Sequence, residues 1–310
     1  MRFGFHVSIA GGLPRAIEEA RARKCETIQI FSRNPQGWRL KPLDPDAVVE
    51  FREGIKHNGI CPVAVHMPYL ENLATGDAAL FAQSVESLSA ELDRAEQLGA
   101  QFVVMHMGRC KEQSEKVALK QMISGIDRAF VRTGSRMPKL LLENTAGMGS
   151  SLGYRFEHLQ RVIEGVKLPN RLGVVLDTAH LFEAGYDLRT RAGLDQTLRE
   201  FDASVGLKRL HLLHLNDSKT DLGSRVDRHW HIGQGRIGRE GFLNMVNHPL
   251  LRSLAGIMET PKTGIGEDRR NMRVIQGLAI SRHASTSARG RAADSEDYEG
   301  NPPILGHIAK

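Results

Sequence analysis

Metal-binding side chains recur at one kind of position in this sequence, the end of a short apolar run. Runs such as PVAVH and FVVMH end in, or carry at their end, a histidine or an acid, and the six residues are His66, His106, Glu143, Asp177, His214 and Glu259. One such residue alone is more often a turn or surface group. Six together predict a metal site, because grouping so many acids and imidazoles without a metal would bury unpaired charge. Imidazole and carboxylate donors suit zinc or manganese.

Two short motifs add further candidate ligands. Asp177-Thr-Ala-His180 spaces its ends at i and i+3, so both side chains can approach one site if a turn follows the run. Asp227-Arg-His229 has i, i+2 spacing, which puts both ligands on one side of an extended segment. His231 nearby stays ambiguous as a ligand. The full set of nine candidates is His66, His106, Glu143, Asp177, His180, His214, Asp227, His229 and Glu259.

Nine ligands match two or three metal ions, since each zinc takes three or four protein ligands and a carboxylate can bridge two ions. Glu143 is the expected bridge, because it is the only carboxylate that ends one of the middle runs. Ions about 3.5–4 Å apart typically stabilise the attacking and leaving oxygens of phosphoryl transfer, and zinc lowers the pKa of its bound water to ~7. No Ser–His–Asp or cysteine nucleophile pattern competes, and Cys110 is not expected to take part.

The runs that end in these residues alternate with stretches of helical periodicity. Eight strand candidates are rich in Val, Ile and Leu, as in a parallel sheet buried on both faces: Arg2–Ser8, Thr27–Ser32, Cys61–His66, Gln101–His106, Lys139–Glu143, Leu172–Asp177, Leu207–Leu215 and Ala255–Glu259. The helical stretches are Leu13–Ala22, Pro45–His57, Ala78–Leu98, Glu112–Arg132, Ser151–Gly165, Leu194–Val205, Arg239–Val246 and Asp268–Leu278. This order predicts a (β/α)8 TIM barrel, whose C-terminal strand ends converge on one face. Strand parity directs His214 toward the barrel axis and His211 toward the helices.

Length and composition fit an ordinary globular chain of 310 residues, 41% hydrophobic and 25% charged. Residues 1–280 are expected to form one barrel domain. The polar stretch 281–310 is expected to be a mobile tail, with docking of Pro302–Ile308 on the barrel as the alternative. No run approaches the roughly 18 apolar residues of a membrane span. The N-terminus lacks a signal-peptide pattern, and three scattered cysteines favour a reducing compartment, so we expect a cytoplasmic protein.

The net charge of +6 belongs to residues 1–280, since residues 281–310 hold four basic and four acidic side chains. Such a surplus fits a polyanionic partner, but it fits a solvated surface equally well. The aromatic content is only 5%, which argues against a nucleic-acid platform of interleaved basic and aromatic residues.

At these residues the sequence resembles the endonuclease IV family, the metal-dependent apurinic/apyrimidinic endonucleases of base-excision repair. The matching text includes HVSIAGGLPRAI, FSRNPQGWR, LLLENTAGMGSSLG, VVLDTAHLFEAGYDLRT and HLNDSKTDLGSRVDRHWHIGQGRIG, and it extends over about residues 3–278. The resemblance implies a (β/α)8 barrel with three zinc ions, where manganese can substitute. It also implies hydrolysis of the phosphodiester 5′ to abasic sites in double-stranded DNA, leaving a 3′-hydroxyl and a 5′-deoxyribose phosphate, and removal of 3′ blocking groups.

Carried over residue by residue, the resemblance distributes the nine ligands among three zinc ions. The first ion would be held by His66, His106 and Glu143. The second would be held by Glu143, Asp177, His214 and Glu259, and the third by His180, Asp227 and His229. Glu143 and Glu259 would also position the attacking water, which makes them the catalytic residues.

The resemblance also implies DNA contacts. Tyr69 and Leu70 match positions that insert at the abasic site, where an apolar wedge offsets lost stacking and an unpaired nucleotide flips cheaply. A packed loop aromatic is the alternative for Tyr69. Gln36 stands where some members have arginine. Loop cations that could contact phosphates are Arg33, Arg39, Lys219, Arg225 and Arg228.

Three positions depart from the family, and two other functions compete. Gln36 is one, the segment 107–110 (MGRC) replaces a common Pro-Gly-Ser-His, and Gln234 stands where glutamate is usual.

The main alternative function is a xylose-isomerase-like sugar isomerase or epimerase, which shares strand-end ligands around two ions but needs no third site. A non-enzymatic DNA-binding module is the other, although it would not need nine converging ligands. We expect a monomer with no membrane partner.

Overall fold

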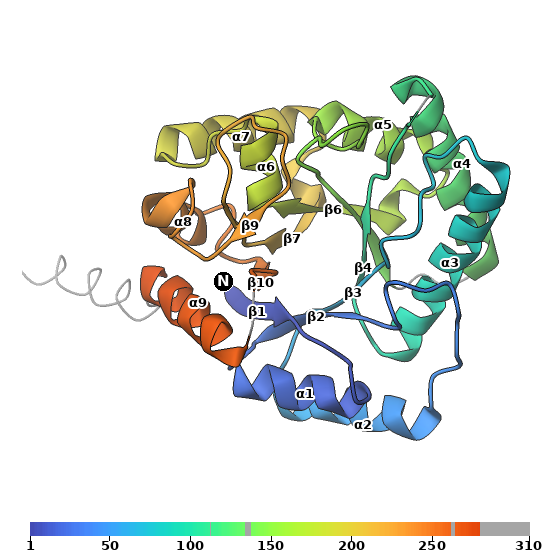
Figure 1. Cartoon of the computed structure of the whole chain (residues 1–310), viewed down its shortest axis with the longest axis horizontal. Coiled ribbons are helices and arrows are strands. Elements are labelled where there is room, and N and C mark those ends of the chain that lie inside the picture. The colour runs from blue at the N-terminus through green and yellow to red at the C-terminus, as the bar shows by residue number, and fades with distance from the viewer. Residues whose placement is uncertain (112, 134–137, 262–263, 280–310) are drawn as a thin grey trace, which may run out of the picture.

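Eight parallel strands close into a barrel in the computed structural model, which describes residues 1–111, 113–133, 138–261 and 264–279. Around the barrel the strands follow the order β1-β10-β7-β6-β5-β4-β3-β2 (Figure 1). Their bounds are β1 (Arg2–His6), β2 (Thr27–Phe31), β3 (Val63–His66), β4 (Phe102–His106), β5 (Lys139–Glu143), β6 (Leu172–Asp177), β7 (Leu210–His214) and β10 (Ala255–Met258). The predicted (β/α)8 fold is therefore confirmed.

Helices surround the barrel on the outside of the strands (Figure 1). They are α1 (Leu13–Ala22), α2 (Pro45–His57), α3 (Ala78–Gln97), α4 (Glu115–Thr133), α5 (Phe156–Gly165), α6 (Thr178–Ala184), α7 (Arg191–Ser204), α8 (Gly238–Val246) and α9 (Ile265–Leu278). Of these, α6 is a short additional helix that lies in the connection between β6 and α7. Aspartates begin several of them by accepting backbone N–H groups, as Asp77 does from Ala79 and Leu80. Helix α6 was not predicted, because its seven residues hold too few turns for a visible period.

The apolar core has two layers. A small cluster fills the barrel itself, where Ala64, Val104, Leu141, Val175 and Ile257 point toward the axis. A larger cluster lies between the barrel and the helices. The close approach of β1 to β2 requires glycine at position 4, because a Cβ there would lie 1.6 Å from the carbonyl oxygen of Thr27. The apolar layers leave the C-terminal strand ends for polar side chains.

The prediction for His211 is wrong. The pairing of β6 with β7 shifts between Val174 and Val175, so that Val174 pairs with Leu210 while Val175 pairs with Leu212. The extra residue breaks strict alternation. The ring of His211 lies 5.7 Å from that of Phe102, which packs against the cluster inside the barrel. His211 thus lies with the interior residues and not with the helix layer, while His214 faces the axis as predicted.

Smaller elements complete the described chain. The 3₁₀ turns Pro169–Arg171 and Leu207–Arg209 lead into β6 and β7, and β8 (Asp217–Ser218) pairs antiparallel with β9 (His229–Trp230). Within the described ranges, no helix combines the length and the apolar character that crossing a membrane would require. The expectation for the tail concerns residues 281–310, which lie outside the described residues.

Candidate metal centre

The strand ends bring the predicted ligands to one face of the barrel. Strand β3 ends at His66, β4 at His106, β5 at Glu143, β6 at Asp177 and β7 at His214. Neighbouring strands hold them in register, since His106 pairs with Glu143 and Asp177 pairs with His214. Parallel strands end on the same face, so side chains far apart in sequence meet there. Glu259 follows β10 by one residue.

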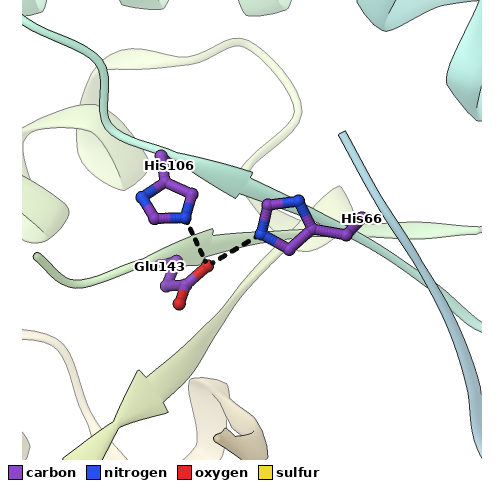
Figure 2. Close-up of side chains that lie close together, drawn as sticks. All are labelled: His66, His106 and Glu143. Atoms are coloured by element: carbon purple, nitrogen blue, oxygen red, sulfur yellow. Dashed lines mark hydrogen bonds and ion pairs between the residues drawn. The ribbon is translucent and has the colours of Figure 1, made fainter. Parts of the chain in front are cut away.

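The first group joins two imidazoles to one carboxylate oxygen. The Nε2 atoms of His66 and His106 each lie 3.2 Å from Oε2 of Glu143, and Figure 2 shows both rings directed at this one oxygen. Glu143 is completely buried. His66 has its Nδ1 2.5 Å from the carbonyl oxygen of Met67, to which a protonated Nδ1 donates. The Nε2 lone pair of His66 is then directed at the centre, as in ligating histidines.

The second group uses the other oxygen of the same carboxylate. His214 places its Nδ1 2.9 Å from Oε1 of Glu143 and 3.4 Å from Oε2 of Glu259. Asp177 lies 3.9 Å from the same nitrogen. Candidate ligand atoms of these four residues all lie within 4.8 Å of one another. Glu143 therefore faces the first group with one oxygen and the second with the other, the geometry that a bridging ligand requires.

The third group depends on elements that do not belong to the barrel strands. Helix α6 begins on the Asp177 side chain, which accepts the backbone N–H of His180 at 3.0 Å. Asp227, near the end of the β8–β9 connection, and His229, the first residue of β9, return to the same place. The Nε2 of His180 lies 3.4 Å from Nε2 of His229 and 3.3 Å from Asp227. Asp177 also joins this group, at 3.5 Å from His229. All nine predicted ligands are thus brought together.

The three groups fit metal ions in both spacing and chemistry. Ligand atoms bound tetrahedrally at zinc distances lie about 3.3–3.4 Å apart, and several N–O separations here are 3.2–3.5 Å. His180 turns its Nδ1 to the carbonyl oxygen of Asn144 at 3.0 Å, and His229 to that of Glu259 at 3.3 Å. These bonds leave the Nε2 atoms for an ion. The residues therefore fit zinc.

The buried carboxylates need positive charge. Burial opposes ionisation of Glu143, but His106 and His214 outweigh it and hold the pKa of Glu143 well below its usual range. In return, Glu259 and Glu143 overcome the desolvation of His214 and raise its pKa to about 9. The pKa of His180 rises well above its usual value, against its burial, chiefly through Asp177 and Asp227. Without cations, protonated imidazoles supply the balancing charge, and divalent cations would replace those protons.

Two residues of the centre were missed from the sequence. Gln29 donates from Nε2 to Oε1 of Glu259 at 2.6 Å and accepts at Oε1 from Nε2 of His214 at 2.9 Å. His6 lies 3.1 Å from the same Glu259 oxygen. A polar residue inside the apolar strand TIQIF was the available signal for Gln29. His6 ends β1 as His66 ends β3. The predicted strand extended to Ser8, so His6 was not recognised as a strand-end residue.

Gln29 should tune metal affinity through the two ligands that it orients. We expect Gln29→Leu to weaken metal binding by about 10–100-fold, because a partner that fixes the ring and carboxylate orientation is lost. Competition against a chelator of known affinity measures the change. Gln160→Leu is the matched control, since Gln160 is a partly exposed α5 residue bonded to Glu164. Equal affinities of the two variants would show that Gln29 does not orient the ligands.

The expected DNA-contacting residues lie on loops at the same face, and all but one of them are exposed. Tyr69 is 66% exposed, and its ring lies 5.8 Å from that of His66, so it stands over the first group. Leu70 is also exposed. The remaining exposed positions are Gln36, Arg39, Lys219, Arg225 and Arg228. Lys219 and Arg225 lie over the rings of Trp230 and Tyr154, at 4.4 and 4.3 Å.

Arg33 is the exception, and the structure contradicts its expected phosphate contact. Its side chain is 5% exposed and forms ion pairs of 2.7 Å with Glu71 and with Glu91. A guanidinium held by two buried carboxylates is not presented to a phosphate. His231, the ambiguous candidate, lies 3.3 Å from the amide of Asn271 and belongs to none of the three groups. Cys110 is buried with its Sγ on the carbonyl oxygen of Ser150.

A cavity of about 390 Å³ opens beside the first group. Its walls come from the β3–α3, β4–α4 and β5–α5 connections, and its lining includes Tyr69, Leu70, His106, Met148 and Asp227. Ligands from the first and third groups thus border a space that a substrate could enter.

Known proteins resemble the whole barrel. The family described as "Xylose isomerase-like TIM barrel" matches residues 17–279. A protein named probable endonuclease 4, from Methanosphaerula palustris, is 44% identical over 284 residues, which are 91% of this chain and 99% of that protein. The crystal structure of endonuclease IV from Thermus thermophilus has a TM-score of 0.80 and 39% identity, covering 90% of this chain and 98% of that one.

A more distant likeness concerns the alternative function. The D-psicose 3-epimerase from Clostridium cellulolyticum has a TM-score of 0.61 and 16% identity, over 94% of this chain and 97% of that one. Likeness at this level shows a shared barrel and nothing about activity. The relatives that match this chain at 39–45% identity over nearly their full length, by contrast, are named probable endonuclease 4 and endonuclease IV. The chain therefore belongs to the endonuclease IV family, a group of DNA-cleaving hydrolases within the xylose isomerase-like TIM barrels.

Proposed function

We propose that this protein is a monomeric, three-zinc enzyme that cleaves the phosphodiester 5′ to abasic sites in duplex DNA. The products are a 3′-hydroxyl and a 5′-deoxyribose phosphate, and the same site removes 3′ blocking groups. One observation carries the proposal: nine ligands form three adjoining groups that share Glu143 and Asp177. Adjoining ions are the arrangement that suits in-line displacement at phosphorus.

The chain's own residues have separate tasks in this reaction. Zinc, when bound, would supply Lewis-acid activation of the phosphate and of the attacking water. Glu143 bridges the first two groups, and Glu259 belongs to the second group, where Gln29 and His6 hold it. These two carboxylates are placed to accept hydrogen bonds from the water and orient it. Tyr69 and Leu70, exposed over the first group, would fill the gap left by the missing base.

The direct test is a nicking assay combined with elemental analysis. Protein loaded with zinc should cut a duplex containing one abasic site on its 5′ side, leave an end that a polymerase extends, and leave the intact duplex uncut. It should contain three zinc ions per chain. Equal cutting of both duplexes, or a single ion per chain, would overturn the proposal. Manganese in place of zinc would change the metal and not the reaction.

Salt should weaken DNA binding steeply. Exposed cations at the metal face include Arg39, Lys219, Arg225 and Arg228. If each neutralises one phosphate, affinity should fall about a hundredfold between about 50 and about 200 mM salt, because bound counterions are released. Fluorescence anisotropy with a non-hydrolysable abasic duplex measures the slope.

Single substitutions show which cations contribute to the dependence of DNA affinity on salt concentration. Lys219→Ala or Arg225→Ala should each lower the slope by about 1. Arg161→Ala is the control, since Arg161 is an exposed α5 residue away from the loops at the metal face. A flat salt response in the unsubstituted protein would point instead to a small neutral substrate.

A further inference from the structure

We infer that a buried ion-pair network fixes the positions of the two loops that carry Gln36 and Tyr69–Leu70, and holds them over the metal centre as one unit. We name it the Arg33 network, and it consists of Ser32, Arg33, Glu71, Ser87, Glu91 and Arg94. The inference rests on the proposed function, because it assigns these loops to contact with abasic DNA. It makes Arg33 a positioning residue.

The guanidinium of Arg33 contacts three different segments. Its Nε donates to Oε1 of Glu91 on α3 at 2.7 Å. One terminal nitrogen donates to Oε1 of Glu71, on the β3–α3 connection, also at 2.7 Å. The other donates to the carbonyl oxygen of Gly37 at 2.6 Å, within the β2–α2 connection itself. A single side chain thus ties two loops to one helix.

Further bonds hold the same two loops to α3. Ser87, on α3, donates its hydroxyl to Glu71. Arg94, about two helical turns further along α3, donates from Nε to the Ser32 hydroxyl at 2.7 Å and from a terminal nitrogen to the carbonyl oxygen of Lys41 at 2.8 Å. Ser32 in turn donates to Oε2 of Glu91 at 2.6 Å. Both ends of the β2–α2 connection are therefore fastened.

The contacts fall directly beside the exposed residues. Glu71 follows Leu70 in sequence, and the Gly37 carbonyl belongs to the residue after Gln36. Each exposed side chain is therefore close in sequence to a buried anchor. Arg33 and Glu71 are 5% and 4% exposed, and Glu91 is fully buried. Burying such charges gains little stability over an apolar replacement, so the network's use is geometric specificity.

The network also relates the loops to the metal ligands. Ser32 follows Phe31, the last residue of β2, which pairs in register with His66. The ring of Tyr69 lies 5.3 Å from that of Phe31 and 6.4 Å from that of His106. Fixing the loops to α3 consequently fixes the height of Tyr69 above the first group. Ordering these loops before DNA arrives avoids an entropic cost on binding.

Glu71→Gln tests the inference with the smallest change of shape. We expect the KM for abasic duplex to rise about tenfold, because a buried Arg33 nitrogen loses its charged partner, while kcat and zinc content stay within about twofold. Hydrogen exchange should quicken in residues 33–43 and 68–74 together. Glu86→Gln is the matched control, an exposed α3 glutamate 3.9 Å from Arg132. Arg33→Met should act like Glu71→Gln, and if it does not fold, Ser87→Ala replaces it.

A second background separates positioning from general damage. In a Gln36→Ala/Tyr69→Ala/Leu70→Ala protein the loops carry none of these DNA contacts, so adding Glu71→Gln should change the KM by less than about twofold. An equal loss in both backgrounds, or quickened exchange in one loop alone, would overturn the inference. So would an unchanged KM in Glu71→Gln when the unsubstituted enzyme nicks normally. An unsubstituted enzyme that does not nick abasic DNA at all would overturn the proposed function, and this inference with it.

Discussion

Replacing Glu143 with alanine should lower the rate of abasic-site nicking by at least about a thousandfold. The reason is that one carboxylate serves two groups: its Oε2 lies 3.2 Å from His66 and from His106, and its Oε1 lies 2.9 Å from His214. Losing it would remove the ligand that the proposed function places between two neighbouring ions. Zinc content should accordingly fall from three ions per chain toward the single ion of the third group.

The barrel should survive this substitution, because Glu143 ends β5 and its side chain lies above the apolar layers and not within them. Circular dichroism and elemental analysis of the same sample separate loss of metal from loss of fold. Glu86→Ala serves as the control for removing a glutamate, since Glu86 is exposed on α3. Full activity in Glu143→Ala, or a zinc content unchanged at three, would show that Glu143 is not the bridge.

The barrel was predictable because its signals are local. Each strand is a short apolar run, and each is followed by a stretch with helical period, so the order alone selects the fold. His66, His106 and Glu143 were predictable for a related reason, because the C-terminal ends of all the strands in this fold lie on one face of the barrel. Their convergence needed no knowledge of which strands are neighbours. Their role as metal ligands stays a prediction that the geometry supports.

What the sequence could not provide depends on partners that are distant along the chain. Arg33 was expected to contact a phosphate because it is a loop cation, yet its partner Glu91 lies 58 residues away on α3. Gln29 reads as an isolated polar residue until His214 and Glu259 are placed beside it. His211 depended on a one-residue register shift between β6 and β7. Such features follow from pairing and packing, which periodicity does not encode.

Asp227 and His229 were predictable in part, as ligand types but not in their position. Asp227 and His229 were recognised as a pair from their spacing, but nothing local predicted the β8–β9 pairing that returns them to His180. Glu183 supports this return: its side chain accepts the backbone N–H of Arg228 at 3.1 Å. The sequence thus indicated which residues could bind a metal, but it did not indicate the secondary-structure elements that position them.

Removing the metal ions should abolish nicking completely and reversibly. Without its ions the centre has no Lewis acid to activate the phosphate or the attacking water. Dialysis against a chelator, followed by addition of zinc, should restore activity together with three ions per chain. Nicking that survives at undetectable metal content would contradict the proposed chemistry. The metal-free protein should stay folded at neutral pH, because protonated imidazoles then balance the carboxylates.

That balance makes the stability of the metal-free protein fall as the pH rises. Glu259 and Glu143 overcome the desolvation of His214 and raise its pKa from 6.5 to about 9. Because the pKa of His214 is higher in the folded state than in the unfolded state, its bound proton stabilises the fold. This contribution is complete below the pKa of the unfolded state and is lost as the pH rises through about 9. The Tm of metal-free protein should therefore drop on the order of 5 °C between about pH 7 and about pH 9.5.

The zinc-loaded protein is the control for this drop, and its Tm should stay nearly constant over the same range, because bound cations replace the protons. Acid acts in the opposite sense through Asp227. Despite its burial, His180 and His229 lower the pKa of Asp227 from 3.8 to about 2, so its contribution is lost as the pH falls through that interval. Scanning calorimetry of both forms measures these slopes. A metal-free Tm that is flat or rising toward pH 9.5 would show that His214 does not carry the balancing proton, and that the carboxylates of the centre are neutralised in some other way.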